Sequence, residues 1–300
     1  MNTKILITGA GGFVGKLLIE ELRSNAIDVL AIAGPQDKTV DSLILDLTRP
    51  ESLEGIDLSS INAVIHLAGL AAVGPSFDNP LQYITTNAGI EINLFEACIK
   101  QRVRPRFLII SSGSLYSPAA TLPLTEESPL LPGSPYAISK MAQENLASYY
   151  GSLGFECIIA RPFNHIGPGQ GPGFIVPDLA LQIKQAMQNN LDTISVGNLS
   201  AKRDYTDVRD IVRAYRLLIE KGEAGKVYNV CSGRSVSGEE LLDGLMEAAG
   251  IRLKPVVEQA KLRPIDNPDI YGSYQKLAQA TGWRPEIKLV QTLRDVIASI

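Results

Sequence analysis

The sequence is poor in the residues that build metal centres and disulfide frameworks. Its 300 residues include two histidines and three cysteines, and the cysteines (Cys98, Cys157 and Cys231) are scattered in apolar surroundings. A histidine-rich metal site is therefore excluded, and no pair of cysteines has zinc-site spacing. Buried thiols of this kind are typical of a reducing compartment, so we expect a cytoplasmic protein without a metal.

Charge and hydropathy exclude two further classes of protein. The chain has 28 Lys and Arg residues against 32 Asp and Glu residues, a net charge of −4, and no basic patch. Nucleic acid is therefore not an expected partner. No run of about 18 apolar residues exists, so we expect no membrane span. The N-terminus enters a strand almost at once, which argues against a signal peptide.

What the chain does have is a regular alternation of strand-like and helical patterns. Hydrophobic residues make up 45% of it, enough for a sizeable core. Short apolar runs predict buried parallel strands, and apolar residues at helical spacing predict helices between them. This alternation predicts an α/β fold, a Rossmann-type doubly wound parallel sheet. The expected strands are 4–8, 29–32, 42–45, 63–68, 106–110 and 156–160, and the expected later helices are 88–100 and 135–150.

The pattern loosens after Pro162, which predicts a smaller C-terminal α/β lobe. Residues 167–177 are rich in Gly and Pro and predict an irregular loop. Residues 227–230 are expected to return to the main sheet. We therefore predict a nucleotide-binding domain of residues 1–165 plus roughly 204–232, and a substrate-binding lobe of residues 166–203 and 233–300. Trp283 is expected to anchor the core of that lobe.

A glycine-rich turn follows the first strand. Gly9 permits a tight turn, Gly12 permits close approach of a pyrophosphate, and Gly15 permits close packing of helix on strand. The amides at the helix start, including those of Phe13 and Val14, would face the phosphates. The strand before and the helix after the turn make this context typical of dinucleotide binding.

The next two strands leave the choice of cofactor open. The second strand ends Ala-Gly-Pro-Gln at residues 33–36, with neither the carboxylate that favours NAD nor an arginine for NADP. This absence leans slightly toward NADP. The third strand ends in Asp46-Leu47, where the carboxylate either accepts from an adenine amino group or caps the following turn. We therefore expect NADP(H) or NAD(H) as cofactor.

Tyr136 and Lys140 form a Tyr-x-x-x-Lys pair on a predicted helix. Positions i and i+4 share one helix face, so the ammonium of Lys140 lies beside the phenol of Tyr136. A neighbouring cation favours the phenolate and lowers its pKa from about 10. We therefore expect Tyr136 to have a lowered pKa and to serve as a proton donor and acceptor near neutral pH.

Together these residues resemble the extended short-chain dehydrogenase/reductases over nearly the whole chain. The resemblance rests on the Thr8–Gly15 turn, His-Leu-Ala-Gly at 66–69, the segment 87–93 beginning with Asn87, Ser111-Ser112 and the Tyr136/Lys140 pair. Members of this family modify nucleotide sugars with a bound nicotinamide cofactor. Segments 161–170, 196–210 and 227–233 are similar to the branch that acts on GDP-mannose and its derivatives.

The resemblance implies the site residues. It implies Ser112, Tyr136 and Lys140 as the catalytic residues. It implies that the cofactor is bound by Gly9, Gly12, Phe13, Val14, Gly15, Asp46, Leu47, Leu67, Ala68, Asn87, Ser111, Tyr136, Lys140 and Pro162. It implies that the GDP-sugar is bound by Ser112, Ser114, Asn164, Val176, Arg203, Arg263 and Asp266. His165 is either catalytic or structural, and His66 is expected to pack at a strand end beside the cofactor.

The residue at position 114 distinguishes a reductase from a 4,6-dehydratase within this branch. A 4,6-dehydratase needs an acid and a base besides the tyrosine, and by resemblance its carboxylate lies two residues before the loop tyrosine. Here that position is Ser114, two residues before Tyr116. We therefore expect reduction of the C4 ketone of GDP-4-keto-6-deoxy-D-mannose to a GDP-6-deoxyhexose such as GDP-D-rhamnose, with Tyr136 as proton donor. The alternatives are a GDP-mannose 4,6-dehydratase, another nucleotide-sugar epimerase or reductase, and, more distantly, a non-catalytic NAD(P) sensor.

The family resemblance also implies a homodimer. The predicted helices near 87–100 and 135–150 are expected to form a four-helix bundle with a second copy. Leu94, Ile99, Leu146 and Tyr150 are the apolar residues expected on the contact.

Overall fold

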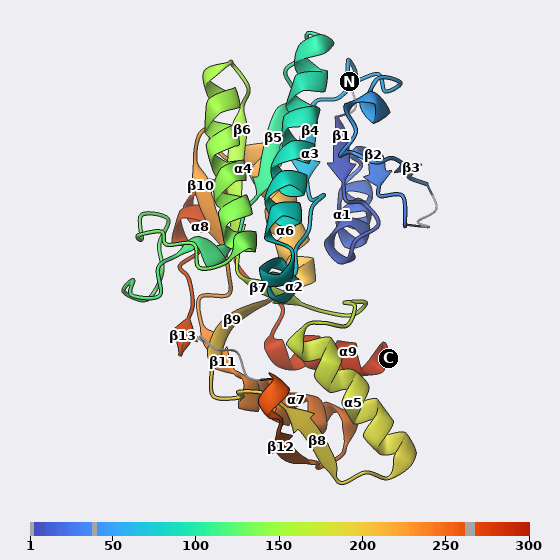
Figure 1. Cartoon of the computed structure of the whole chain (residues 1–300), viewed down its shortest axis with the longest axis vertical. Helices are drawn as coiled ribbons and strands as arrows, with labels where there is room; N and C mark the ends of the chain where they lie inside the picture. Colours follow the sequence, from blue (N-terminus) through green and yellow to red (C-terminus); the bar gives the residue numbers. More distant parts are fainter. Residues whose placement is uncertain (1–2, 38–40, 262–267) are drawn as a thin grey trace.

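Figure 1 shows the computed structural model, which describes residues 3–37, 41–261 and 268–300. Its larger part is a seven-stranded sheet in the order β10-β6-β5-β4-β1-β2-β3 with every neighbouring pair parallel. This order confirms the predicted doubly wound sheet. The strands are β1 (Lys4–Thr8), β2 (Asp28–Ala33), β3 (Leu43–Ile44), β4 (Ala63–His66), β5 (Arg106–Ile110), β6 (Cys157–Pro162) and β10 (Val227–Val230).

Helices cover both faces of the sheet. Successive residues of β1 point to opposite faces, so Ile5 and Ile7 join one apolar cluster while Leu6 joins the other. Both faces are buried, which is why the strands are continuous apolar runs. The Ile5 face is covered by α1 (Phe13–Ser24), α6 (Val208–Lys221) and α8 (Gln275–Thr281), and the Leu6 face by α3 (Pro80–Lys100) and α4 (Pro135–Ser152).

The start of α4 is fixed by its sequence. Ser134 Oγ accepts a hydrogen bond from the amide of Ala137 at 3.1 Å, and Pro135 occupies the first turn, where its missing N–H costs nothing. Tyr136 therefore lies in the first turn of α4, beside the carboxyl edge of the sheet.

The smaller part lies below the carboxyl edge of the sheet in Figure 1. Its core packs α5, α7 and α9 against short strands. Its elements are β7 (Asn164–Ile166), α5 (Ile175–Asn189), β8 (Thr193–Val196), β9 (Lys202–Asp207), β11 (Ser235–Ser237), α7 (Gly238–Ala249), β12 (Lys254–Val257), β13 (Asp269–Ile270) and α9 (Leu289–Ala298). The helix α2 (Val73–Asp78) and three 3-10 turns, η1 (Pro50–Leu53), η2 (Gly113–Leu115) and η3 (Gln259–Lys261), complete the described elements.

Most element boundaries agree with the sequence, and several differ. Residues 227–230 rejoin the sheet as predicted, because β10 pairs with β6. Helix α3 begins at Pro80 instead of residue 88. The strand expected at 42–45 is two residues long, because it is an edge strand whose Leu43 and Ile44 are exposed. Helix α5 begins at Ile175, so the predicted loop ends earlier than residue 177.

Trp283 anchors a different core from the one predicted. Its side chain is fully buried in the cluster beneath α1, α6 and α8, and its indole N–H donates to the carbonyl of Asp210 at 2.9 Å. The segment that includes α8 and Trp283 therefore packs against the sheet. The division of ligand-binding roles between the two parts remains a prediction.

The residues predicted for a subunit contact also lie in the core. Leu94 and Tyr150 are buried against the sheet, and Ile99 and Leu146 pack against the same cluster. The prediction of these four residues as an outer stripe is wrong. Both helices have an apolar inner face that the sequence alone did not separate from their outer face.

Two searches of the described part of the chain gave no candidates. No helix there has the length and apolar character needed to cross a membrane. No group of three or more His, Cys, Asp or Glu side chains in the same ranges has the arrangement of a metal site. All three cysteines are buried and unpaired.

Candidate active site

The glycine turn between β1 and α1 has the geometry of a phosphate cradle. Gly9 has a φ of +69°, and a Cβ atom there would come within 2.8 Å of the amide nitrogen of Ala68. A Cβ atom at Gly15 would overlap the carbonyl oxygen of Gly9, so helix and strand approach as closely as predicted. Gly12 precedes α1 and no side chain caps the helix. The first amides of α1, at Phe13 and Val14, are therefore available to an anion.

Thr8 and Asn87 fix the strand end beside this turn. Thr8 Oγ1 accepts from the amide of Ala68 at 3.1 Å, which ties β4 to β1 at the segment containing Leu67. The Asn87 side chain accepts from the amide of Leu70 at 2.7 Å and donates to Ser139 Oγ at 2.9 Å. Asn87 is fully buried, so its side chain shapes the loop and joins α3 to α4.

Ser112 lies at the carboxyl end of β5, where ligands bind in sheets of this kind. Its Oγ accepts from the amide of Ser114 at 3.1 Å and from the hydroxyl of Ser114 at 2.9 Å. The Ser112 side chain also lies near the phenol of Tyr136, close enough to lower its pKa. The structure thus brings the loop serine near the helix tyrosine, and the catalytic roles of both remain a prediction.

The protonation of Tyr136 differs from the prediction. Burial raises the pKa of Tyr136, the Ser112 side chain partly opposes this, and nearby Tyr83 adds to it. The predicted lowering by Lys140 is wrong here because the ammonium is directed to other acceptors. A phenol that stays protonated at neutral pH is suited to donate a proton.

Lys140 is held by two oxygen acceptors. Its Nζ donates to the carbonyl of Ile110 and to Gln143 Oε1, both at 2.8 Å, and lies 6.0 Å from the centroid of the Tyr136 ring. Burial lowers the pKa of Lys140 to about 8, although the charges of Glu91 and Glu144 oppose that shift. The ammonium is therefore the main form below pH 8.

His66 extends this hydrogen-bonded network to the glycine turn. Its Nε2 lies 3.3 Å from Gln143 Nε2, and its Nδ1 lies 2.8 Å from Thr8 Oγ1. Burial lowers the pKa of His66 to about 3, so the ring is neutral and can accept from the Gln143 amide. The predicted packing of His66 at the strand end is confirmed. Gln143 was not predicted, because its role depends on the packing of α4 against β4.

A buried ion pair supports the loop that carries Ser112. Arg161 on β6 forms a two-bond contact with Glu144 on α4, with distances of 2.8 and 2.7 Å. Ser111 Oγ donates to the same carboxylate at 2.5 Å. The hydroxyl of Ser111, predicted to contact the cofactor, is therefore used inside the protein. The ion pair was not predicted, because Glu144 belongs to no motif and the motif that begins with Arg161 does not indicate a partner for it.

Three other residues that were predicted to bind the cofactor are hydrogen-bonded or buried within the protein. Asp46 accepts from the hydroxyl and amide of Thr48, and these hydrogen bonds lower its pKa. This is the turn-capping alternative considered for Asp46. Leu47 is buried, with its carbonyl held by Asn93, and Pro162 is buried at the end of β6. Any contact of these residues with a cofactor remains a prediction.

Asp37 is a carboxylate that the sequence analysis did not find at this site. The amide of Asp37 donates to the carbonyl of Gly34 at 2.9 Å, which closes a turn after β2. The turn brings the carboxylate back against the glycine turn, where a Cβ atom on Gly11 would overlap it. A search for an acid at the end of the strand missed it, because Gly34 and Pro35 reverse the chain before Asp37 is reached.

The predicted substrate residues divide into three groups. Asn164 is exposed at the start of β7, and Arg203 is half-buried on the neighbouring strand β9. Val176 is fully buried in the core of the smaller part, so its side chain does not face a ligand and that prediction is wrong for the side chain. Arg263 and Asp266 lie outside the described residues.

His165 has the surroundings of a structural residue. Its ring is stacked near Phe13, with centroids 6.3 Å apart, and Nδ1 lies 3.3 Å from the carbonyl of Phe163. Burial lowers the pKa of His165, so the ring is neutral.

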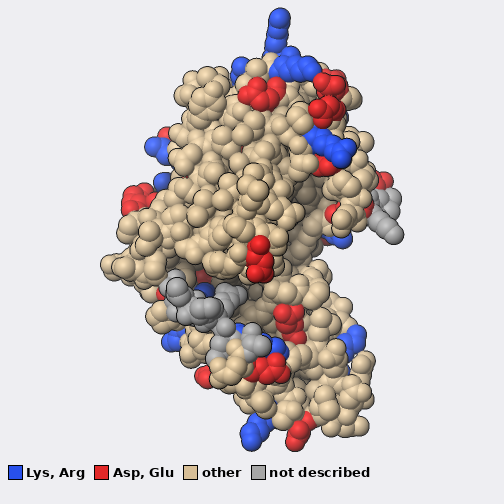
Figure 2. Space-filling model, in the orientation of Figure 1, with Lys and Arg blue, Asp and Glu red and all other residues tan. Residues whose placement is uncertain are grey.

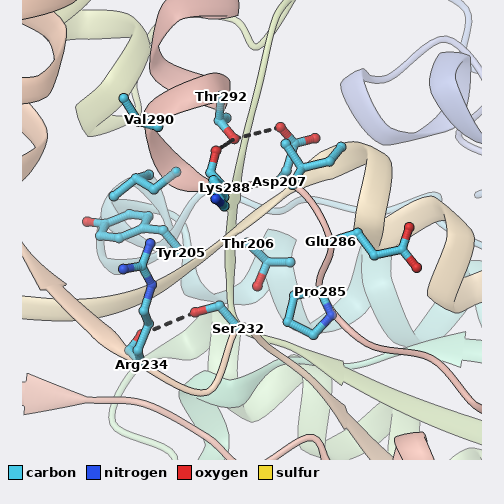
Figure 3. A pocket seen from close by; sticks show the side chains of 12 residues that line it. Tyr205, Thr206, Asp207, Ser232, Arg234, Pro285, Glu286, Lys288, Val290 and Thr292 are labelled. Carbon is cyan, nitrogen blue, oxygen red and sulfur yellow. Dashed lines mark hydrogen bonds between the residues drawn. The ribbon is translucent and has the colours of Figure 1, made fainter.

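A hollow of about 560 Å³ adjoins β9, the strand that pairs with Asn164 and His165 of β7 (Figure 3). It is lined by residues of β9, of the β10–β11 loop and of the segment entering α9, including Tyr205, Arg234 and Lys288. The hydroxyl of Thr292 donates to Asp207 at 2.7 Å in its wall. None of the predicted catalytic, cofactor or substrate residues lines it.

A parallel sheet with a glycine turn, a serine near a tyrosine, and a lysine one turn further along the helix defines a nicotinamide-dependent oxidoreductase of the short-chain type. The model of the NAD dependent epimerase/dehydratase family matches residues 5–231, and the chain belongs to this family.

Similar proteins in this family include a nucleotide-sugar reductase. The chain is 37% identical to the GDP-6-deoxy-D-mannose reductase of Pseudomonas aeruginosa, with 99% of this chain and 97% of that protein aligned. A solved structure of RMD from Pseudomonas aeruginosa complexed with NADPH superposes with a TM-score of 0.91, at 36% identity, covering 99% of this chain and 98% of that one. The Thermus thermophilus UDP-glucose 4-epimerase complexed with NAD gives a TM-score of 0.86 at 28% identity, covering 99% and 98%.

Proposed function

We propose that the protein reduces the C4 ketone of GDP-4-keto-6-deoxy-D-mannose to a GDP-6-deoxyhexose, GDP-D-rhamnose, with hydride from NADPH or NADH. The observation that carries this proposal is the pairing of Ser112 with Tyr136 beside Lys140, next to a hydroxyl at Ser114. The likeness to a GDP-6-deoxy-D-mannose reductase supports the substrate.

The residues of the glycine turn fit a dinucleotide. The cradle at Gly9 and Gly15 has no room for a Cβ atom, and no described side chain caps the start of α1. These groups would hold the pyrophosphate, and Lys140 with Tyr136 would border the nicotinamide end. When bound, the reduced cofactor supplies the hydride that reaches C4.

The protein's own residues supply the proton and the charge stabilisation. Ser112 and Tyr136 donate to the C4 oxygen, where negative charge develops as the hydride arrives. Tyr136 transfers its proton to that oxygen and becomes a phenolate. The Lys140 ammonium stabilises the phenolate until solvent returns the proton. One hydride and one proton are added, so a ketone becomes an alcohol.

Dehydration is disfavoured by the chemistry at residue 114. Expelling the C6 hydroxyl of GDP-mannose needs an acid near C6, and a serine hydroxyl near its ordinary pKa does not act as one. The Ser114 hydroxyl is used as a donor to Ser112. A non-catalytic NAD(P) sensor is disfavoured because Ser112, Tyr136 and Lys140 are all present.

The smaller part of the molecule would hold the GDP group. Arg203 and Arg263 are proposed to contact the pyrophosphate, Asp266 the ribose, and Asn164 the adjoining oxygens. Arginine suits phosphate oxygens because its guanidinium donates two parallel hydrogen bonds. The cytoplasm is the proposed location, supported by three unpaired thiols.

A dimer through the outer faces of α3 and α4 is proposed. In Figure 1 these helices lie in front of the sheet, and the surface over them in Figure 2 carries few charged side chains. The charged residues of α4, Lys140 and Glu144, are both buried, so its outer face is uncharged. Exposed apolar side chains there include Leu81, Ile92, Ile138 and Tyr149. A two-fold contact of four helices would cover them.

The deciding experiment is incubation with enzymatically made GDP-4-keto-6-deoxy-D-mannose and each reduced cofactor. We expect oxidation of the cofactor in a 1:1 ratio to the sugar consumed, with NMR of the product showing the equatorial C4 hydroxyl of GDP-D-rhamnose and no ketone. Absence of cofactor oxidation with both NADH and NADPH would contradict the proposal.

A further inference from the structure

Glu91 is a buried acid without a hydrogen-bond partner. It lies on α3, its side chain is fully buried, and neither Oε1 nor Oε2 forms a hydrogen bond with any described residue. A carboxyl group in this state is costly, because burial removes water and no hydrogen bond from a described residue replaces it. Its place in the structure therefore calls for a physical reason.

The position of Glu91 is fixed by the packing of α3 on α4. Glu91 follows Asn87 by one turn, so both lie on the same helix face. That face contacts α4, because Asn87 bonds to Ser139 and its carbonyl accepts from Gln143 at 3.2 Å. The other end of the Gln143 amide accepts from Lys140 Nζ. Glu91 is thus placed beside the Lys140–Gln143 pair.

The electrostatic data agree with this placement. Burial raises the pKa of Glu91 well above its usual value, opposed by the positive charge of Lys140 and by the nearby Gln143 side chain, although neither carboxyl oxygen makes a well-formed hydrogen bond with it. In return, the charge of Glu91 is the strongest influence opposing the lowered pKa of Lys140. The two groups interact across the contact between the helices.

The other titratable groups around the pair are already matched or neutral. Glu144 on α4 is held by Arg161 and Ser111, and His66 on β4 is neutral. Five further titratable groups interact electrostatically with Glu91 or Tyr136 or with each other. They are Tyr83 on α3, Tyr136 and Tyr150 on α4, Cys157 on β6 and Tyr215 on α6. Burial raises the pKa of each of these five, so they are neutral at pH 7. Among the described residues, Glu91 is therefore the acid near Lys140 that no cation or hydrogen bond already matches, and its charge affects Lys140 more than the charge of Glu144 does.

We propose that Glu91 is a positioning residue whose carboxylate keeps Lys140 in its ammonium form as the pH rises toward the alkaline side. The two groups titrate as a coupled pair: the neutral acid stands beside the ammonium at low pH, and the ion pair forms as Glu91 ionises. Without Glu91 the buried ammonium has only neutral acceptors and loses its proton at lower pH. The effect of Glu91 on the pH profile of catalysis rests on the proposed reductase function. Its effect on the titration of Lys140 does not.

The titration of Lys140 can be followed without substrate. Protein labelled with ¹³C at the lysine Cε carbon is titrated by NMR, and the Lys140 signal is assigned by its absence in Lys140→Met. We expect a midpoint about one pH unit lower in Glu91→Gln than in the wild type, a tenfold change in acid dissociation. Glu96→Gln is the matched control, because Glu96 lies on α3 but is exposed and bonds to Tyr150. It should leave the midpoint unchanged.

If Glu91→Gln does not fold, Glu91→Met replaces it in this test, because a buried acid can often be replaced by an apolar side chain of similar volume. It should lower the midpoint in the same way, and Glu91→Asp should restore it in part. An unchanged Lys140 midpoint in the folded charge-free variant would overturn the inference, whatever its activity.

The pH profile of ketone reduction gives the second measurement. The alkaline limb of kcat/KM should move to lower pH in Glu91→Gln by the shift seen in the NMR titration, while the limiting value near pH 6 stays within about twofold. A uniform loss at all pH values would show a structural effect and count against the inference. If the NMR shift is present but no variant reduces the ketone, the inference about Lys140 stands and the proposed function fails.

Discussion

The hydroxyl of Ser114 donates to Ser112 Oγ at 2.9 Å, and the amide of Ser114 donates to the same oxygen at 3.1 Å. With both acceptor positions of Ser112 used, its own hydrogen is left to donate. In the free protein that hydrogen is available to Tyr136, and with a ketone in place it is available to the carbonyl oxygen. Ser114 thus orients the donor and leaves the phenol hydrogen of Tyr136 for the same oxygen.

Replacing Tyr136 with phenylalanine should abolish most of the reduction. The ring and its packing remain, but the alkoxide loses its proton donor, which typically costs 10²–10⁴-fold. We expect at least a 10²-fold loss of kcat, with cofactor binding changed by less than about twofold. Tyr149→Phe is the control, because this tyrosine lies on the same helix but is exposed. A Tyr136→Phe variant with near-normal turnover would remove Tyr136 from the mechanism.

The buried pair of Glu144 and Arg161 should dominate the stability of the loop carrying Ser112. Glu144→Gln leaves the guanidinium without its carboxylate at a site where Arg161 is almost fully buried. Breaking such a pair costs about 3–5 kcal/mol, which urea unfolding at pH 7 would measure. Glu156→Gln removes the exposed partner of Arg106 and should cost below about 1 kcal/mol. Equal effects of the two substitutions would contradict the role given to the buried pair.

The sequence predicted what depends on local pattern. Apolar runs around Ile5–Ile7 predicted a strand buried on both faces, and the glycines from Gly9 to Gly15 predicted the turn after it. The i, i+4 spacing placed Tyr136 and Lys140 on one side of a helix. These features follow from chain geometry that is the same in any protein.

What the sequence could not predict depends on contacts between distant segments. The pKa of Tyr136 depends on where Lys140 finds its acceptors, and these come from β5 and from Gln143. Asp37 reaches Gly11 only because a turn reverses the chain. Leu94 and Tyr150 belong to helices that have one apolar face toward the sheet and another toward solvent, and the periodic pattern does not say which residues face which side.

The outer faces of α3 and α4 should hold two copies together. Ile92→Glu or Tyr149→Glu would place a charge, and its two-fold mate, in an uncharged contact. We expect the wild type to sediment as a dimer at micromolar concentration and both variants to sediment as monomers. Met187→Glu on α5 is the control, because Met187 is also exposed but lies on the smaller part. A wild-type monomer, or variants that remain dimeric, would contradict this contact.

Asp37 should disfavour NADPH relative to NADH. Its carboxylate lies against Gly11, beside the expected site of the adenosine ribose, where it can accept from a 2′-hydroxyl but repels a 2′-phosphate. We expect Asp37→Ser to raise the ratio of NADPH to NADH affinity by about tenfold, or about 1.4 kcal/mol. Fluorescence titration with each cofactor measures this without substrate. Asp28→Ser is the control and should leave this ratio unchanged, because Asp28 lies at the opposite end of β2. An unchanged ratio in Asp37→Ser would show that the Asp37 carboxylate takes no part in the choice of cofactor.

Ser114 should prevent the protein from acting as a dehydratase. Given GDP-mannose and NADP⁺ or NAD⁺, Ser112, Tyr136 and Lys140 are sufficient to begin oxidation at C4. Loss of the C6 hydroxyl then requires an acid, and the hydroxyl of Ser114 is instead a donor to Ser112. We expect no product lighter by one water in the mass spectrum, even after many hours with micromolar protein. The same preparation should consume the preformed 4-keto-6-deoxy sugar with loss of one reduced cofactor per molecule. Robust formation of the 4-keto-6-deoxy product from GDP-mannose would overturn the reductase proposal and favour the alternative, a GDP-mannose 4,6-dehydratase.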